Sequence, residues 1–154
     1  MFFKVYRYKY PRPSVTVDIV LLSYTQAYPQ VLLIRRKNPP FQNLWALPGG
    51  FIHLDETLKE SALRELYEET NIKDVQLTEV GTFGQPDRDP RGRVITIAYV
   101  GIISKDQQEA VAGSDASEVL WHSTSDLPRL AFDHNLIIEK ALEINETLRT
   151  NLEP

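Results

Sequence analysis

Three glutamates within one short stretch are the feature of this sequence best suited to chemistry. Glu65, Glu68 and Glu69 are spaced i, i+3 and i+4, so a helix from Thr57 to Thr70 would place their carboxylates side by side. Like charges at this spacing repel one another, and a bound cation reverses the sign of the interaction. Mg²⁺ takes carboxylate and carbonyl oxygens while it keeps several waters. A solvated acidic face is the alternative, but the crowding favours a divalent-metal site.

The segments around these acids contain the signals expected for positioning them. Thr57-Leu58-Lys59-Glu60 has the form of a capping box that begins a helix, and Asn71 after Thr70 tolerates the left-handed geometry that ends one. Upstream, Leu47-Pro48-Gly49-Gly50 supplies two adjacent glycines where the backbone can turn or approach a ligand closely. We therefore expect a loop there that brings a backbone carbonyl towards the acidic helix.

Runs of aliphatic and β-branched residues predict strands on both sides of this helix. The predicted hairpins are Ser14 to Tyr24 with Val31 to Ile34, and Val75 to Phe83 with Val94 to Ile103. A short strand is expected around Val119-Leu120-Trp121. Asp133 is expected to cap a last helix, in which apolar residues recur at helical spacing at Ile137, Ala141, Ile144 and Leu148.

Composition narrows the class of protein. The 154 residues are 42% hydrophobic and 25% charged, which is typical of a globular chain, and no linker divides it, so we expect one domain over 1–154. The absence of cysteine excludes thiolate catalysis and disulfides. The net charge is -4 with dispersed basic residues, and no run resembles a signal peptide or a membrane span. We therefore expect a cytoplasmic protein that binds a small molecule, and neither nucleic acid nor a membrane.

A longer pattern surrounds the glutamates. Gly50 is followed by five residues, Glu56, seven further residues, and then Arg64-Glu65-Leu66-Tyr67-Glu68-Glu69-Thr70-Asn71-Ile72. This resembles the Nudix box, G-x5-E-x7-R-E-U-x-E-E-x-G-U, where U is aliphatic. Six fixed positions match over 23 residues. The one departure is Asn71 in place of glycine, and because asparagine also adopts positive φ, we expect the helix end to be preserved.

The resemblance extends beyond the box and implies a fold and a set of roles. Tyr10 to Asp18, Leu44 to Phe51 and Leu130 to His134 are similar to the Nudix branch that contains ADP-ribose pyrophosphatases and ADP-ribose-sensing transcription regulators. The implied fold is α+β, with a mixed sheet sandwiched between helices. Such enzymes bind two or three Mg²⁺ or Mn²⁺ ions along a diphosphate and activate a water for attack on phosphorus.

The resemblance assigns roles to the residues of the box. Glu65 and Glu69 would be the principal metal ligands, and Glu68 would face the metals directly or through water. The Gly49 carbonyl would complete the shell, Arg64 would orient the carboxylates, and Glu56 would support the loop and helix. The family often adds one more acid from a distant loop, as a metal ligand or base. Asp115 is the first choice for it here, with Glu118 second.

Substrate contacts are expected mainly from arginines outside the box. Arg88, Arg91 and Arg93 lie in a polar loop and have planar donors suited to phosphate oxygens, although they could instead pair with aspartates in a solvated turn. Arg35 and Arg36, after a predicted strand, are similar candidates. Trp45 and Phe83 are candidates for stacking on adenine, with core packing as the alternative. For His134, hydrogen bonding at a helix start is favoured over catalysis.

The leading hypothesis from the sequence is hydrolysis of ADP-ribose to AMP and ribose 5-phosphate. A second enzymatic reading is hydrolysis of an oxidised nucleoside triphosphate or another nucleotide sugar. A reading of a different class is a sensor that binds ADP-ribose with little or no turnover. The intact acids favour the enzyme. The preferred metal and the oligomeric state, for which a homodimer is one option, stay open.

Overall fold

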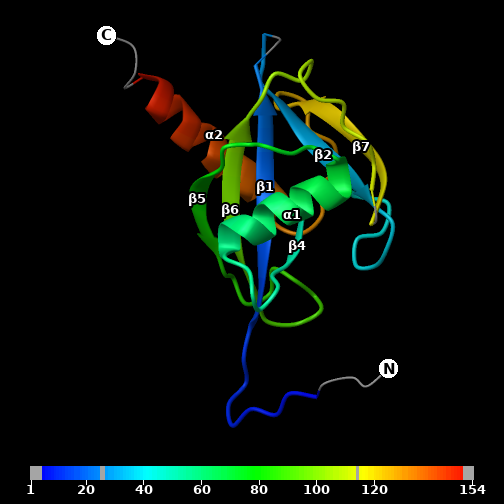
Figure 1. The fold of residues 1–154 in the computed structure, drawn as a ribbon, viewed down its shortest axis with the longest axis vertical. Coiled ribbons are helices and arrows are strands. Elements are labelled where there is room, and N and C mark those ends of the chain that lie inside the picture. Colours follow the sequence, from blue (N-terminus) through cyan, green and yellow to red (C-terminus); the bar gives the residue numbers. More distant parts are fainter. Residues whose placement is uncertain (1–4, 25–26, 114, 151–154) are drawn as a thin grey trace.

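A mixed β-sheet with one helix packed on each face forms the fold (Figure 1). The computed structural model describes residues 5–24, 27–113 and 115–150, with side chains as far as residue 147. In chain order the elements are β1 Ser14–Ser23, β2 Gln30–Arg36, β3 Trp45–Ala46, β4 Gly49–Phe51, α1 Leu58–Thr70, β5 Thr78–Phe83, β6 Val94–Ile102, β7 Ala116–Ser123 and α2 His134–Thr150. The expected α+β architecture is confirmed.

The pairing of the strands makes the sheet mixed. Its main order is β3-β2-β1-β6-β5, with β4 added along β1 and β7 along β2. β1 runs parallel to β6, and the other pairs are antiparallel. Both predicted hairpins, β1 with β2 and β5 with β6, are therefore confirmed. The parallel contact between β1 and β6 joins the two hairpins into one sheet.

Alternation along β1 explains why the sheet carries a helix on each face. Successive side chains of a strand point to opposite faces. Val17, Ile19 and Leu21 pack in the cluster that includes Ala62 and Leu66 of α1. Val20 and Leu22 pack in the cluster that includes residues of α2. The nearly continuous apolar run of β1 is thus the sequence of a strand buried on both faces.

Helix α1 begins and ends where its local sequence predicts. The Glu60 N–H donates to Thr57 Oγ1 at 3.2 Å, and the Thr57 N–H donates to Glu60 Oε2 at 2.7 Å, which completes the capping box. At the other end Asn71 adopts φ 61°, and its N–H donates to the Tyr67 carbonyl at 2.8 Å. Asparagine therefore takes the left-handed position where the Nudix pattern usually has glycine.

Several boundaries differ from the sequence predictions. Val75 and Leu77 are buried but precede β5, which begins at Thr78. Gly49 and Gly50 lie in β4, paired with β1, rather than in a loop. In α2, Ile137 and Ala141 are fully buried and Ile144 packs against the same cluster, whereas the side chain of Leu148 lies outside the described part. Among the described residues no helix is long and apolar enough to cross a membrane.

Candidate active site

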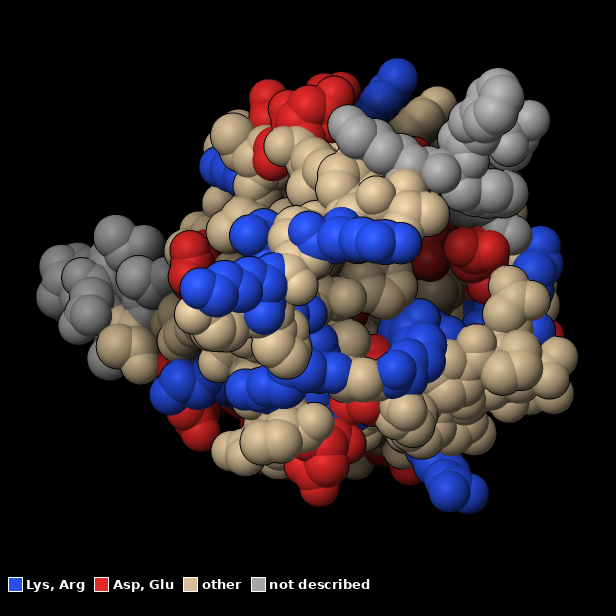
Figure 2. Space-filling view, turned by 90° about the horizontal axis from the view of Figure 1, so that it is seen from below, with Lys and Arg blue, Asp and Glu red and all other residues tan. Residues whose placement is uncertain are grey.

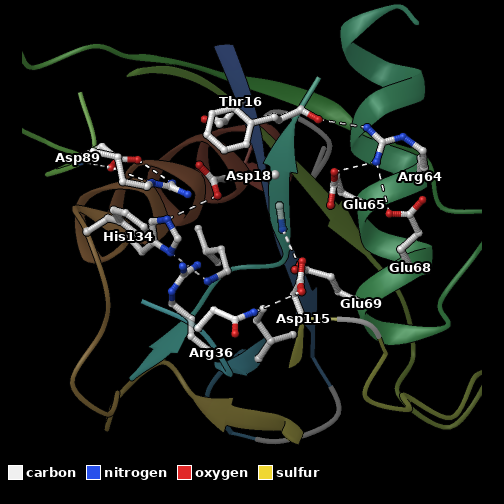
Figure 3. A pocket seen from close by; sticks show the side chains of 18 of the residues that line it. Thr16, Asp18, Arg36, Arg64, Glu65, Glu68, Glu69, Asp89, Asp115 and His134 are labelled. Atoms are coloured by element: carbon white, nitrogen blue, oxygen red, sulfur yellow. Dashed lines mark hydrogen bonds and ion pairs between the residues drawn. The ribbon is translucent and has the colours of Figure 1, made fainter. Parts of the chain in front are cut away.

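The acidic face of α1 lies against β4 and contributes one wall of a pocket (Figure 3). The Glu69 side chain is buried, that of Glu65 is mostly buried, and that of Glu68 is about half exposed, at 46%. Arg64 Nη1 donates to Glu65 Oε1 at 2.7 Å and to Glu68 Oε2 at 3.3 Å. The three glutamates predicted from their spacing therefore share one surface, and a single arginine contacts two of them.

Arg64 also connects these acids to Glu56. Its Nε donates to the two oxygens of Glu56 at 2.8 and 3.0 Å, and Ser61 Oγ donates to the same carboxylate at 2.7 Å. The Ser61 hydrogen bond, together with those from Arg64, lowers the pKa of Glu56. Burial opposes ionisation of Arg64, but its hydrogen bonds to Glu65 and Glu56 outweigh burial and raise its pKa. Glu56 thus stays ionised and fixes the direction of the Arg64 guanidinium.

Glu69 has the most perturbed environment of the three helix acids. Its Oε2 accepts the Gly49 N–H at 2.9 Å. Burial, followed by the charges of Glu65, Asp115 and Asp18, raises the pKa of Glu69 to about 8, although the Gly49 hydrogen bond acts in the opposite direction. Burial also raises the pKa of Glu65, against the effect of Arg64. Carboxylates held together in this way have a strong electrostatic demand for a cation.

The two glycines of β4 permit the close approach of β4 to its neighbours. A Cβ on Gly49 would lie 2.2 Å from the Val17 carbonyl oxygen and 2.6 Å from Asp18 Oδ1. A Cβ on Gly50 would lie 2.6 Å from the carboxylate of Glu65. The close approach expected here therefore brings β1 and the acidic helix against the backbone, and any side chain at either position would displace them.

A distant loop brings Asp115 to the same pocket. The Gly113 N–H donates to the Glu69 carbonyl at 3.1 Å, which docks this loop on the end of α1. Asp115 lines the pocket and adds to the charge that raises the Glu69 pKa. Glu118, the second choice for the distal acid, instead pairs with Arg35 at 3.0 Å and is not among the residues lining the pocket.

The donor set suits a hard divalent cation, but it is not a closed cage. No three acidic or histidine side chains converge on one point among the residues that the structure describes. Glu65 and Glu68 instead contact Arg64, and Glu69 contacts a backbone N–H. Mg²⁺ is usually held by one or two carboxylates together with waters and substrate phosphates. Crowded, partly buried carboxylates therefore fit an ion whose shell the substrate completes.

The pocket has the acids of α1 on one side and, on the side that we call basic, Arg36 together with Arg91 and its partner Asp89. Its volume is about 450 Å³. Figure 3 shows Glu65, Glu68 and Glu69 on one side, and Arg36, Asp89 and His134 on the other. The residues that line it come mainly from β1, β2, β4, α1 and the loops before β6 and α2. The enclosed space therefore offers ligands for a cation and donors for an anion within one pocket.

Two arginines with different partners stand on the basic side. Arg36 is partly buried, and its Nε donates to the Pro40 carbonyl at 2.8 Å. Burial and the charge of Arg91 lower the pKa of Arg36, although the charges of Glu69, Asp89 and Asp115 oppose this. Arg91 is bidentate to Asp89, at 3.0 and 2.7 Å. In the described part of the chain no carboxylate lies within ion-pair distance of Arg36.

Arg88 has a different environment from Arg91, although the sequence suggests the same role for both. Its side chain is 3% exposed, and its guanidinium donates to both oxygens of Asp133 at 3.0 and 2.7 Å. Asp18 Oδ2 lies 3.8 Å away. Arg88 borders the pocket, but its guanidinium donates both hydrogen bonds to Asp133. The sequence alternative, pairing of the arginine with an aspartate, is therefore what the structure shows, although the pair lies inside the protein and not in a solvated turn.

A buried polar cluster beneath the pocket was not anticipated from the sequence. Thr96 Oγ1 donates to Asp18 Oδ2 at 2.6 Å, and His134 Nε2 lies 3.4 Å from Asp18 Oδ1. His134 Nδ1 accepts the Leu47 N–H at 2.9 Å, so its proton is assigned to Nε2. Burial lowers the pKa of His134. Asp18 was the one residue in the sequence that indicated such a cluster, because a carboxylate within the apolar run of β1 must find buried partners.

Trp45 and Phe83 lie away from the pocket. Trp45 in β3 contacts the His122 ring at 4.5 Å between centroids and packs against the cluster beneath α2. Phe83 packs against the same cluster and borders a separate groove between β5 and α2. The structure therefore does not bring either ring to the acids of α1, and core packing describes both positions.

Comparisons with known proteins agree with this geometry. The NUDIX domain model matches residues 12–142. An ADP-ribose pyrophosphatase of Methanocaldococcus jannaschii is 42% identical over 84% of this chain and 73% of its own length. The ADPR responsive transcriptional repressor NtrR of Acinetobacter baylyi is 39% identical over 86% of this chain, and the match covers 54% of the repressor.

Among solved structures, the NUDIX domain of Shewanella oneidensis NrtR complexed with ADP ribose has a TM-score of 0.82 and 37% identity. That match covers 88% of this chain and 90% of the other. A family model that spans residues 12–142, the identity to these relatives and the shared fold agree, and the chain belongs to the Nudix family.

Proposed function

We propose that this chain is a divalent-metal-dependent pyrophosphohydrolase that cleaves ADP-ribose to AMP and ribose 5-phosphate. The observation that carries the proposal is the division of the pocket into an acidic side, with Glu65, Glu69 and Asp115, and a basic side with Arg36. Arg91 also lines the pocket, and its guanidinium shares the Phe132 ring with that of Arg36. Metal ions held by carboxylates and arginine side chains can both neutralise the charge of a diphosphate. The name of the M. jannaschii relative supports ADP-ribose as the substrate.

The acidic side is where Mg²⁺ or Mn²⁺ would be held. Glu65 and Glu69 would be the main ligands, with Glu68 and the Gly49 carbonyl beside them and Asp115 as a further ligand or base. A bound ion would neutralise the diphosphate and lower the pKa of an attacking water. Arg64 keeps the carboxylates oriented before the substrate arrives, which lowers the cost of reorganisation during the reaction.

The basic side would bind phosphate oxygens. Guanidinium groups present paired N–H donors that match phosphate geometry. On the face seen in Figure 2, Lys and Arg side chains gather around a hollow although the net charge of the chain is -4. A local concentration of positive charge attracts an anionic nucleotide even to a protein of opposite net charge.

An ADP-ribose sensor is the second candidate, and it has a specific observation in its favour. One relative is an ADPR responsive repressor, and another was solved with ADP ribose bound. Sensing requires binding but no turnover. In this chain all the acids of the box are present, and Glu65, Glu68 and Glu69 lie on one wall of the pocket, which favours turnover. The two functions differ in whether AMP accumulates.

The first test is a product assay with control of the metal. With Mg²⁺ or Mn²⁺ we expect ADP-ribose to be converted to AMP and ribose 5-phosphate, and excess chelator to abolish conversion until metal is restored. Products would be resolved by anion-exchange chromatography, beside an oxidised nucleoside triphosphate and another nucleotide sugar. Full activity in chelator contradicts the metal site. Tight binding of ADP-ribose without AMP would favour the sensor, and preference for a triphosphate would replace the proposed substrate.

Arg36 and Arg35 offer a matched pair of variants for the substrate contact. Arg36 faces the pocket, whereas the neighbouring Arg35 donates to Glu118 at the surface. Arg36→Ala should raise KM for ADP-ribose by about 10- to 100-fold with a smaller change in kcat, because a charged hydrogen bond contributes about 1.5–3 kcal/mol. Arg35→Ala should stay within about twofold, since exposed ion pairs contribute little. Equal effects at both positions would contradict a specific role for Arg36.

A further inference from the structure

Phe132, just before α2, has a backbone conformation that disfavours a bulky residue. Its φ is 53°, in the left-handed region that glycine and asparagine adopt with least strain. Phe41 in a separate loop has φ 56°, and the two rings meet edge to face with centroids 4.8 Å apart. Such strain persists where surrounding contacts hold it, and it occurs often at ligand sites. The contacts of the Phe132 ring should therefore explain why a phenylalanine stands there.

Those contacts are with residues of the pocket. The guanidinium carbons of Arg36 and Arg91 lie 5.0 and 5.6 Å from the Phe132 ring centroid, within the range of cation–π attraction. The His134 ring packs against Phe132 at 5.2 Å. Two arginines that come from different hairpins are thus gathered around one ring. Arg91 also stacks on Phe51 at 5.0 Å and is held by Asp89, and Arg36 is held by the Pro40 carbonyl. Phe132 is the ring that both guanidinium groups share.

The residues that follow Phe132 are held by buried hydrogen bonds. Asp133, the next residue, accepts two hydrogen bonds from the guanidinium of the buried Arg88. Arg88 belongs to the same loop as Arg91. His134, the residue after that, accepts the Leu47 N–H. The backbone that follows Phe132 is therefore anchored at two consecutive residues, which limits the freedom of the ring to move away from the two guanidinium groups.

We propose that Phe132 is a positioning residue that holds Arg36 and Arg91 together as one subsite for the diphosphate, opposite the carboxylates of α1. The inference rests on the proposed function only for the identity of the substrate. An anion with two phosphoryl groups would accept hydrogen bonds from both guanidinium groups, and it would also relieve the repulsion between them. Arg36, which has no carboxylate partner among the described residues, would gain most from that contact.

The test uses inorganic pyrophosphate as the probe, with excess chelator, so that binding is measured by calorimetry independently of turnover. Phe132→Leu keeps an apolar side chain but removes the aromatic face, and we expect about a fivefold or greater loss of pyrophosphate affinity. Phe132→Tyr keeps the ring and should retain affinity within about twofold. KM for ADP-ribose should rise in Phe132→Leu more than kcat falls.

Phe41→Leu is the matched control, because it makes the same change at a second phenylalanine with positive φ that contacts Phe132 but has no cation–π contact with either arginine among the described residues. It should lose less affinity than Phe132→Leu. Unchanged pyrophosphate affinity in a folded Phe132→Leu protein would overturn the subsite, even if ADP-ribose is hydrolysed. Loss of pyrophosphate affinity in a chain that does not cleave ADP-ribose would overturn the proposed function and leave the subsite standing. An equal loss in Phe132→Tyr would also overturn it, because the ring would then not be the cause.

Discussion

Glu69→Gln should lower kcat by at least about 100-fold with Mg²⁺ present, as expected for a group that stabilises charge in the transition state. Glutamine has nearly the same size but cannot supply a charged ligand. Glu69 combines the deepest burial among the acids of α1 with the charges of Glu65 and Asp115 nearby, so its carboxylate is the one that most requires a cation. The measurement is steady-state kinetics on ADP-ribose. A loss below about tenfold would contradict its place as a principal ligand.

The same variant should show that the activity is lost without loss of the fold. The pKa of Glu69 is raised in the folded protein to about 8, so the folded state favours the protonated acid. The stability that protonated Glu69 contributes is fully present below its unfolded-state pKa near 4.5. It is lost as the pH rises towards 8, because the carboxylate must then be ionised in its buried site. Because glutamine does not ionise, Glu69→Gln in chelator should unfold at a higher temperature than the parent at pH 9, and close to it at pH 4.5.

Glu60→Gln provides the control on the same helix. Glu60 lies in the first turn of α1 and serves the capping box, a role that glutamine also performs. Its pKa is lowered by the hydrogen bond with Thr57, so its linkage to pH has the opposite sign. We expect near-parental activity. A similar loss of kcat in Glu60→Gln would indicate that altering any acid of α1 disturbs the site.

The features predicted well from the sequence are those fixed by neighbouring residues. The start of α1 at Thr57 and its end at Asn71 depend on capping signals, and the two hairpins depend on apolar, β-branched runs; all of these act over a few positions. The position of Asp115 beside Glu69 came from the family resemblance rather than from any local signal. Local signals could place the acids on one helix face but could not locate the opposite wall of the pocket.

The roles that could not be predicted depend on long-range partners. Arg88 and Arg91 are alike in the sequence, yet one is buried against Asp133 and the other is bidentate to Asp89 at the pocket edge. The difference arises because α2 packs back on the sheet and brings Asp133 within reach of Arg88, 45 positions away. Trp45 and Phe83 likewise pack against the core cluster beneath α2 and do not line the pocket. Residue type alone does not determine which of two similar side chains tertiary packing will bury.

Arg88→Ala should therefore act mainly on stability, by about 3–5 kcal/mol of the free energy of unfolding, because it leaves the buried Asp18 and the partly buried Asp133 carboxylates without their cation. Arg88→Lys should recover part of the loss, since lysine restores the charge but not the bidentate geometry. Urea unfolding at pH 7 measures both. Arg35→Ala, which breaks a surface pair with Glu118, should cost less than about 1 kcal/mol.

A double variant separates the buried charge from other effects of losing Arg88. Asp133→Asn removes the uncompensated carboxylate, so Arg88→Ala combined with Asp133→Asn should cost less than the sum of the two single changes. If the loss came only from the cavity left by arginine, the two costs would add. The opposite result would contradict a structural role. If the free energy of unfolding of Arg88→Ala stays within about 1 kcal/mol of the parent while KM for ADP-ribose rises, Arg88 binds substrate as Arg36 is proposed to do.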